Sequence, residues 1–189
     1  MAGVNIQISE QGLKRANQIL HSLQADTSKV TARVVNRVMD GMRTDAVSET
    51  SQKYYVKAKD VRSSITFRKA TAGNLMGEMI SRDKRHNLAD YQLTPKSPSK
   101  GKKTVIQGAV KKAGGLKTLK SAFLVRRGGR YFPYYRTGKG RWKISSFISP
   151  SMPQIIKNEE TVKVMQEKAE ERFEKRLSHE IMRLVGATA

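Results

Sequence analysis

Residues 91–158 contain 16 lysines and arginines but no aspartate or glutamate, in a 189-residue chain with a formal net charge of +21. By the same count, residues 1–90 carry +6 and residues 159–189 carry −1. A surface of one sign attracts polyanions and repels like charges. This segregation therefore indicates a polyanionic partner, with nucleic acid first and an acidic protein surface second.

The basic segment has the pattern of a folded region. Glycines separate four apolar or aromatic runs, at 104–106, 122–125, 131–135 and 142–148. Such runs between glycines and prolines predict short strands and turns, whereas a disordered basic tail has few aromatic residues. Only residues 94–103, with two prolines and no large apolar side chain, have the pattern of a mobile loop throughout.

The first half of the chain alternates strand and helix signals. Residues 4–8 alternate apolar and polar side chains, which predicts a strand, and a helix is expected after Ser9, with Leu13, Ala16, Leu20 and Leu23 at helical spacing. A second, long amphipathic helix is predicted over 27–50 from an apolar stripe at Val30, Val34, Val38, Met42 and Ala46. Gly41 costs that helix up to about 1 kcal/mol relative to alanine, which indicates close packing or a bend.

Shorter elements follow. Residues 54–65 predict a turn and a short helix, and 66–70 with 75–81 predict two strands joined as a hairpin. Residues 88–93 predict another strand, and the two prolines of 150–154 predict a rigid junction.

The last helix, over 159–185, has the clearest periodicity. Its apolar positions recur about every 3.7 residues, close to the 3.6 of an α-helix. Four of them are our candidates for packing in the core or between subunits: Met165, Phe173, Leu177 and Ile181.

Together these signals predict an α+β fold, with a mostly antiparallel central sheet packed by the long helix of the N-terminal half and by the long C-terminal helix. We expect a single domain over 1–189, made of a helix–strand half (1–90), a basic strand and loop region (91–158) and a C-terminal helix (159–189).

Catalytic and metal motifs are missing from the sequence. There is no cysteine, no histidine pair has metal-ligand spacing, and the Gly-Lys pairs lack the upstream glycine of a phosphate-binding loop. Asp83, His86 and Asp90 have spacing that suits one helix face, but their neighbours indicate strand and loop. We therefore predict no enzyme activity, no cofactor and no metal.

Our DNA-contact candidates are basic residues of the central segment. Three arginines flank a Gly-Gly turn, which lets guanidinium groups point toward phosphates or, equally, toward carboxylates of a neighbouring protein. The full set is Arg126, Arg127, Arg130, Lys100, Lys102, Lys103, Lys111 and Lys112. The tyrosines at 131–135 and Trp142 suit stacking on bases, but their apolar neighbours favour a sheet core or a subunit interface.

The absence of cysteine and of a membrane-spanning apolar stretch predicts a soluble protein, made and first used in the cytoplasm.

Several segments resemble the minor tail protein Z family of lambda-like long-tailed phages. They are the strand–helix–helix order at the start, residues 55–62 (YVKAKDVR), Ile65 through Ala70, Gly128-Gly129 followed by Tyr131-Phe132, the 136–141 turn, 150–154 (PSMPQ) and the terminal helix. The resemblance spans nearly the whole chain, and its motifs are structural. The 94–103 loop has no counterpart in it.

The resemblance implies a tail completion protein, part of the virion, at the head-proximal end of a long non-contractile tail. Its expected partners are the tail terminator, the tail tube, the head–tail connector, further copies in a hexameric ring, and phage DNA held by non-specific phosphate contacts. No membrane is expected. The alternative from another class is a stand-alone, non-specific nucleic-acid-binding protein, with a nuclease as a more distant one.

Overall fold

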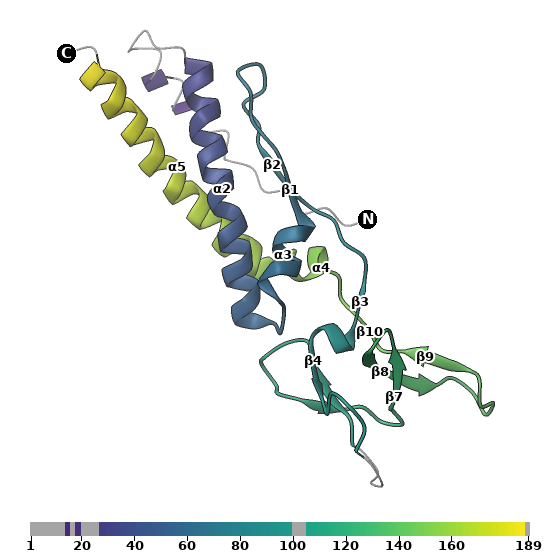
Figure 1. The fold of residues 1–189 in the computed structure, drawn as a ribbon. Coiled ribbons are helices and arrows are strands. Elements are labelled where there is room, and N and C mark those ends of the chain that lie inside the picture. The colour runs from purple at the N-terminus through teal and green to yellow at the C-terminus, as the bar shows by residue number, and fades with distance from the viewer. Residues whose placement is uncertain (1–13, 16–17, 20–26, 100–104, 188–189) are drawn as a thin grey trace.

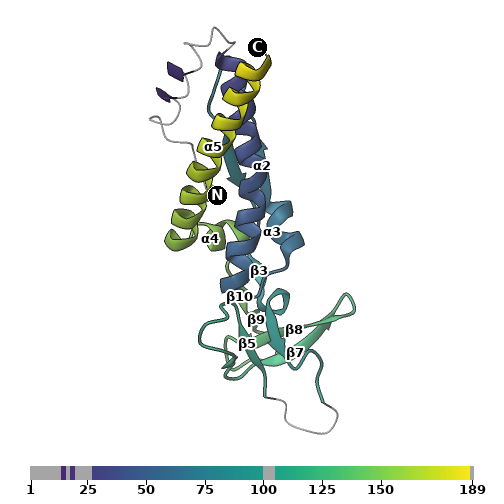
Figure 2. The ribbon, with the colours of Figure 1, turned by 90° about the vertical axis from the view of Figure 1, so that its left-hand side faces the viewer.

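The computed structural model describes residues 14–15, 18–19, 27–99 and 105–187. Two long antiparallel helices, α2 (Thr27–Lys53) and α5 (Glu159–Ala187), form one end of an elongated molecule, and small sheets form the other end (Figures 1 and 2). The predicted strand at 4–8 and the apolar positions of the predicted helix after Ser9 lie outside the described residues. Both long helices are confirmed, with α2 continuing three residues beyond the predicted end.

The core lies between these two helices. The α2 stripe from Val30 to Ala46 is buried against an α5 stripe that includes Met165, Phe173 and Leu177, and Ile181 packs at its edge. Apolar spacing of three and four residues places each stripe on one face of its helix. This mutual burial positions α5 along α2 for most of its length.

Polar contacts fix the alignment of the helix pair. Arg172 donates two hydrogen bonds to the Asp45 carboxylate, at 2.6 and 3.1 Å, and Lys168 Nζ lies 2.7 Å from Glu49 Oε1. Nearer the two ends, Arg33 pairs with Glu180 and Lys53 with Glu160. All four of these cations therefore have acidic partners on the facing helix.

The predicted short helix and hairpin are confirmed as α3 (Ala58–Ser64), β1 (Ile65–Arg68) and β2 (Glu78–Ser81). The two strands are antiparallel and run along α2 (Figure 1). The Asn36 amide of α2 makes two hydrogen bonds to the backbone of Ala70, each 2.9 Å long, and so attaches the hairpin to the helix. Gly77 packs directly on Met39, which leaves no room for a side chain there.

The other strands form three small antiparallel sheets at the far end of the molecule. The first pairs β3 (His86–Asn87) with β10 (Ile148–Ser149), and the second contains β4 (Gln92–Thr94), β5 (Gln107–Ala109) and β6 (Lys117–Thr118). The third contains β7 (Phe123–Arg127), β8 (Arg130–Arg136) and β9 (Ile144–Ser146). The α+β class and the antiparallel pairing are confirmed, and the strands are divided among four sheets. The expectation of a single domain stays a prediction.

Two local predictions were wrong. The expected strand at 88–93 begins as a 3-10 helix, η1 (Leu88–Asp90), because the Asn87 side chain accepts from Ala89 N–H and Asp90 accepts from Asn87 N–H. The expected junction at 150–154 contains the start of a helix, α4 (Met152–Ile156). Ser151 N–H donates to Gln154 Oε1 at 2.9 Å, and Pro153 lies in the first turn, where a missing N–H has no cost.

Candidate nucleic-acid interface

The hairpin turn between β7 and β8 is flanked by three candidate arginines. Gly128 and Gly129 have φ of 51° and 78°, a region that glycine adopts without steric cost and that two-residue hairpin turns require. This turn pairs Arg127 with Arg130 directly across the hairpin, and all three arginines, with Arg126, are exposed. Like charges at directly opposed positions repel each other. An anion bound at the turn would relieve this repulsion.

Arg130 differs from its two neighbours because it is already engaged. Its Nη2 lies 3.1 Å from Asp90 Oδ1 and donates to the Ala89 carbonyl at 3.2 Å. It therefore ties the hairpin to η1. Arg126 and Arg127 have no ion-pair partner among the described residues, so their charges are available to a ligand.

Aromatic rings support several of the guanidinium groups. Arg127 lies 5.7 Å from the Tyr134 ring centroid, and Arg136 lies 5.4 Å from that of Phe123. Guanidinium groups are attracted to ring faces at such distances. Tyr134 and its neighbours on β8 are partly buried in the sheet, where Tyr135 packs on Phe147 with centroids 4.9 Å apart. These rings therefore hold arginines and form the sheet, and Trp142 alone among the aromatic residues of the basic segment is fully exposed.

Lys111 and Lys112 lie against the end of α2, apart from the arginine turn. Lys112 N–H donates to the Lys53 carbonyl at 2.9 Å, and Lys111 forms a β-bridge with Tyr54. The hydrogen bond and charge of Lys53, with a smaller effect of Lys111, hold the pKa of Glu160 below its ordinary value. Lys111 thus has an acidic neighbour. The last three candidates, Lys100, Lys102 and Lys103, lie outside the described residues.

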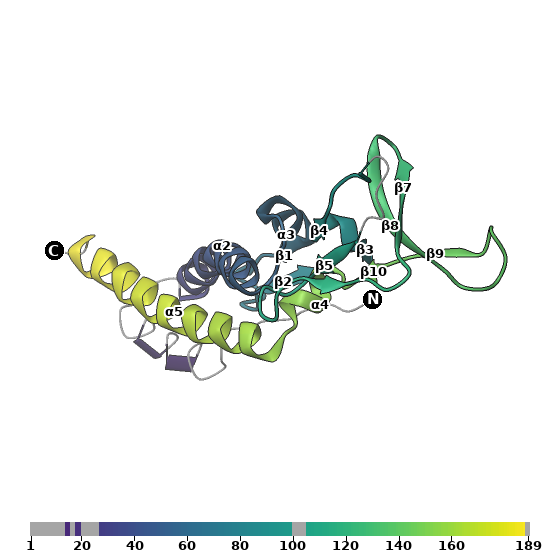
Figure 3. The same ribbon diagram turned by 90° about the horizontal axis from the view of Figure 1, so that it is seen from below.

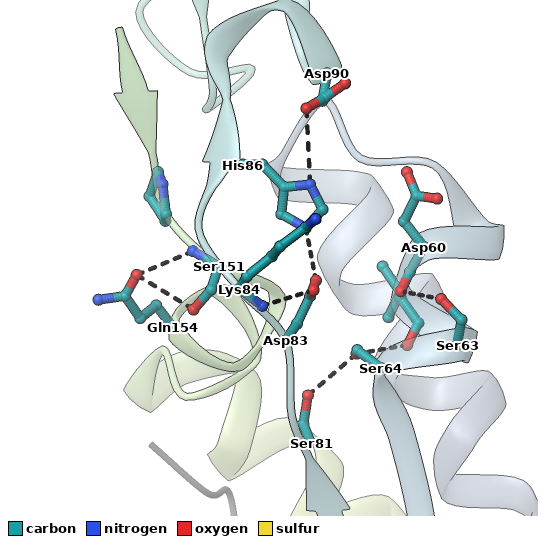
Figure 4. Close-up of polar contacts among 12 residues, drawn as sticks. Asp60, Ser63, Ser64, Ser81, Asp83, Lys84, His86, Asp90, Ser151 and Gln154 are labelled. Carbon is teal, nitrogen blue, oxygen red and sulfur yellow. Dashed lines mark hydrogen bonds and ion pairs between the residues drawn. The ribbon is translucent and has the colours of Figure 1, made fainter. Parts of the chain in front are cut away.

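A cluster around His86 connects the helical body to the basic end (Figure 4). His86 Nε2 lies 2.6 Å from Asp83 Oδ2, and its Nδ1 lies 3.8 Å from Asp90 Oδ2. Asp90 in turn binds Arg130, so a chain of contacts runs from the end of β2 to the β7–β8 hairpin. Within the described ranges no group of acidic and histidine side chains has the arrangement of a metal site. The sequence shows the 83–86–90 spacing, but nothing in it predicts the link to Arg130.

Tyr91 closes the same junction. Its hydroxyl donates to the Pro150 carbonyl at 2.6 Å. Burial, followed by the negative charges of Asp83, Asp90 and Asp60, raises the pKa of Tyr91 well above its ordinary value of 10.0. The phenol therefore remains neutral and keeps the strand before α4 attached to β4.

The four α5 candidates lie inside the helical body. Met165, Phe173 and Leu177 are buried and Ile181 is partly buried, all packed with residues of the same chain. None of the helices in the described parts of the chain has the length and apolar character of a membrane span.

A family model described as prophage minor tail protein Z (GPZ) matches residues 11–185. The comparison with curated proteins gives no match. The comparison with solved structures gives none either.

Proposed function

The chain belongs to the prophage minor tail protein Z family, so it is a phage minor tail protein and a component of the virion, and we propose that it completes the head-proximal end of a long tail. In this proposal several copies, six in the simplest match to a tail tube, form a ring where head and tail join. The ring contacts the tail terminator, the tail tube and the head–tail connector. Its basic end surrounds the DNA that leaves the head.

The observation that carries the DNA part is the difference in charge pairing between the two ends. In the helical body, cations such as Arg33, Lys168 and Arg172 have acidic partners within the chain. Among the basic residues described in 105–157, only Arg130 has one. Unpaired cations on turns bind phosphates through charge and counterion release, without reading sequence.

The alternative of a stand-alone nucleic-acid-binding protein has no support from the comparisons, because the matching family consists of tail proteins. Family membership also argues for a structural role and against an enzyme. The remaining question for the basic end is therefore which component of the particle it contacts.

The position in the tail is tested with particles that lack the protein. Purified protein, carrying a label visible by electron microscopy, is added to tails assembled without it. We expect the label at the end that joins the head, and light scattering of the complex should give a ring stoichiometry. A protein that stays monomeric and ignores tails, or a label at the distal tip, contradicts the proposal.

A further inference from the structure

The β8–β9 loop and the strands after it present apolar side chains that the described chain leaves largely or partly exposed. Trp142 is 86 % exposed, Ile144 40 % and Ile148 63 %. Trp142 lies in the turn that leads into β9, Ile144 begins β9 and Ile148 begins β10. β9 is also an outer strand of its sheet, with one edge unpaired among the described residues. An exposed apolar edge strand is the usual site of pairing with another chain.

The loop that carries Trp142 is held in a defined conformation. Arg136 Nη1 donates to the Arg141 carbonyl at 2.7 Å, and Thr137 N–H donates to the Lys143 carbonyl at 2.9 Å. The Arg141 guanidinium lies 5.5 Å from the Trp142 ring centroid. Trp142 is therefore an exposed apolar side chain on a loop held by hydrogen bonds, and it is flanked by the cations Arg141 and Lys143. Figure 3 shows this loop pointing away from α5 and diverging from the β7–β8 hairpin.

The first half of α5 has the opposite charge. Between residues 159 and 174 its exposed charged side chains are one lysine, Lys163, and six glutamates: Glu159, Glu160, Glu167, Glu170, Glu171 and Glu174. The other two cations of this stretch, Lys168 and Arg172, are turned toward α2. The molecule thus has an acidic helix face and a basic segment, residues 91–158, that contains no aspartate or glutamate.

A hollow of about 500 Å³ lies on this acidic face, over the first turns of α5. Val162 and Gln166 are among the residues that line it. Its rim carries Glu159 and Glu167, together with two cations, Lys157 and Lys163. An indole ring suits such a site, because its apolar body enters the hollow while neighbouring cations approach the glutamates.

We propose that Trp142 of one copy packs into this α5 hollow of the next copy, with Arg141 and Lys143 facing its glutamates. The occupant is a second copy because the loop points away from α5 of its own chain, and because the basic loop and the largely acidic face of α5 are opposite in charge. A contact between two different patches is heterologous, and it closes into a ring when its rotation allows. This inference rests on the proposed ring and assigns its interface.

The single tryptophan of the chain makes the contact directly observable. Burial of Trp142 on ring assembly should shift its fluorescence emission to shorter wavelength, and duplex DNA alone should not. Trp142→Ala should abolish the ring peak in light scattering and leave the melting temperature unchanged. Met182→Ala removes another exposed apolar side chain, on α5, and should change neither the ring peak nor the melting temperature.

Cysteine cross-linking locates the partner surface, since the chain has no cysteine of its own. Lys143→Cys and Lys163→Cys are introduced in separate proteins, which are mixed, assembled and treated with a short thiol cross-linker. A 143–163 heterodimer is expected, and none when Met182→Cys replaces Lys163→Cys.

Two outcomes overturn the interface and leave the tail function standing. One is a ring in which the Trp142 emission is unshifted and the 143–163 cross-link is absent. The other is an emission shift produced by DNA and not by assembly, which would make a nucleic acid the occupant. A wild-type protein that forms no ring contradicts the proposed function itself.

Discussion

The Arg172 guanidinium lies across Gly41, where a Cβ atom would come within 2.5 Å of Nη1. Through this space Arg172 reaches Asp45 on α2, whose side chain is almost fully buried. Gly41 weakens α2 locally, but its missing side chain leaves the space through which Arg172 of α5 forms two hydrogen bonds to the Asp45 carboxylate. Of the two explanations for Gly41 that the sequence left open, close packing or a bend, close packing is confirmed.

Gly41→Ala should therefore destabilise the protein although alanine is the better helix former. The added methyl group displaces Arg172 from the Asp45 carboxylate. Hydrogen bonds to a charged group contribute about 1.5–3 kcal/mol, whereas the replacement of glycine by alanine in a helix gains only about 1 kcal/mol. We expect the free energy of unfolding to fall by about 1 kcal/mol in urea denaturation. In an Arg172→Ala background the same substitution should instead stabilise. Stabilisation in both backgrounds would disprove the contact.

Phe173 fills the centre of the α2–α5 interface and is 2 % exposed. Phe173→Ala should lower the free energy of unfolding by about 3–5 kcal/mol, because it removes buried area and leaves a cavity. Met182→Ala, at an exposed position of the same helix, should change it by less than about 0.5 kcal/mol. Equal stability of the two variants would mean that α5 does not pack on α2 as described.

Tyr91 predicts a loss of stability in alkali. Its folded-state pKa lies above that of an unfolded tyrosine, so folding favours the protonated phenol. The stability it contributes is complete below pH 10 and declines as the pH rises further, because the unfolded chain then loses the proton first. Lys168, whose pKa is raised chiefly by its hydrogen bond to Glu49, acts in the same direction.

Tyr91→Phe separates the two contributions. The variant should be less stable than wild type at pH 8, since it loses the hydrogen bond to Pro150, but its stability should fall less steeply above pH 10. Denaturation at several pH values measures the slopes, and absorbance at 295 nm follows tyrosine ionisation. Identical alkaline slopes would contradict a neutral, half-buried Tyr91.

The long helices were predictable because their evidence is local. Val30 to Ala46 and Met165 to Leu177 repeat with the helical period, and burial of those stripes follows from that period. The 3-10 helix at Leu88–Asp90 was missed because the side chains of Asn87 and Asp90, not the apolar run, decide the backbone there. The start of α4 at Met152 was missed for a similar reason, the bond between Ser151 and Gln154.

The arginine turn was predictable from Gly128 and Gly129, whereas the role of Arg130 was not. Its bond to Asp90 depends on how the hairpin lies on η1, and His86 is positioned by pairing of β3 with β10, where it faces Ser149. Contacts between residues this far apart in the chain leave no periodic signal in a single sequence. Charge counting likewise grouped Lys111 with the arginines, although the fold places it beside Glu160.

The last prediction concerns what Arg126 and Arg127 bind. Each cation that neutralises a phosphate releases counterions, so the slope of log affinity against log salt changes by about 0.9 per contact on duplex DNA. Replacing both arginines by alanine should weaken binding to any duplex and make that slope shallower by about 1.8. Lys175→Ala with Arg176→Ala removes the same charge from α5 and should leave the slope unchanged.

Arg130→Ala provides a second comparison, because it also removes the bond to Asp90 and should therefore lower the melting temperature. The double replacement of Arg126 and Arg127 should leave the melting temperature unchanged. If the control pair on α5 weakens DNA binding as much as the turn pair, the attraction comes from total charge and the turn is no site. If the turn variant keeps its DNA affinity and salt slope but no longer attaches to tails, then these arginines bind carboxylates of a neighbouring tail protein.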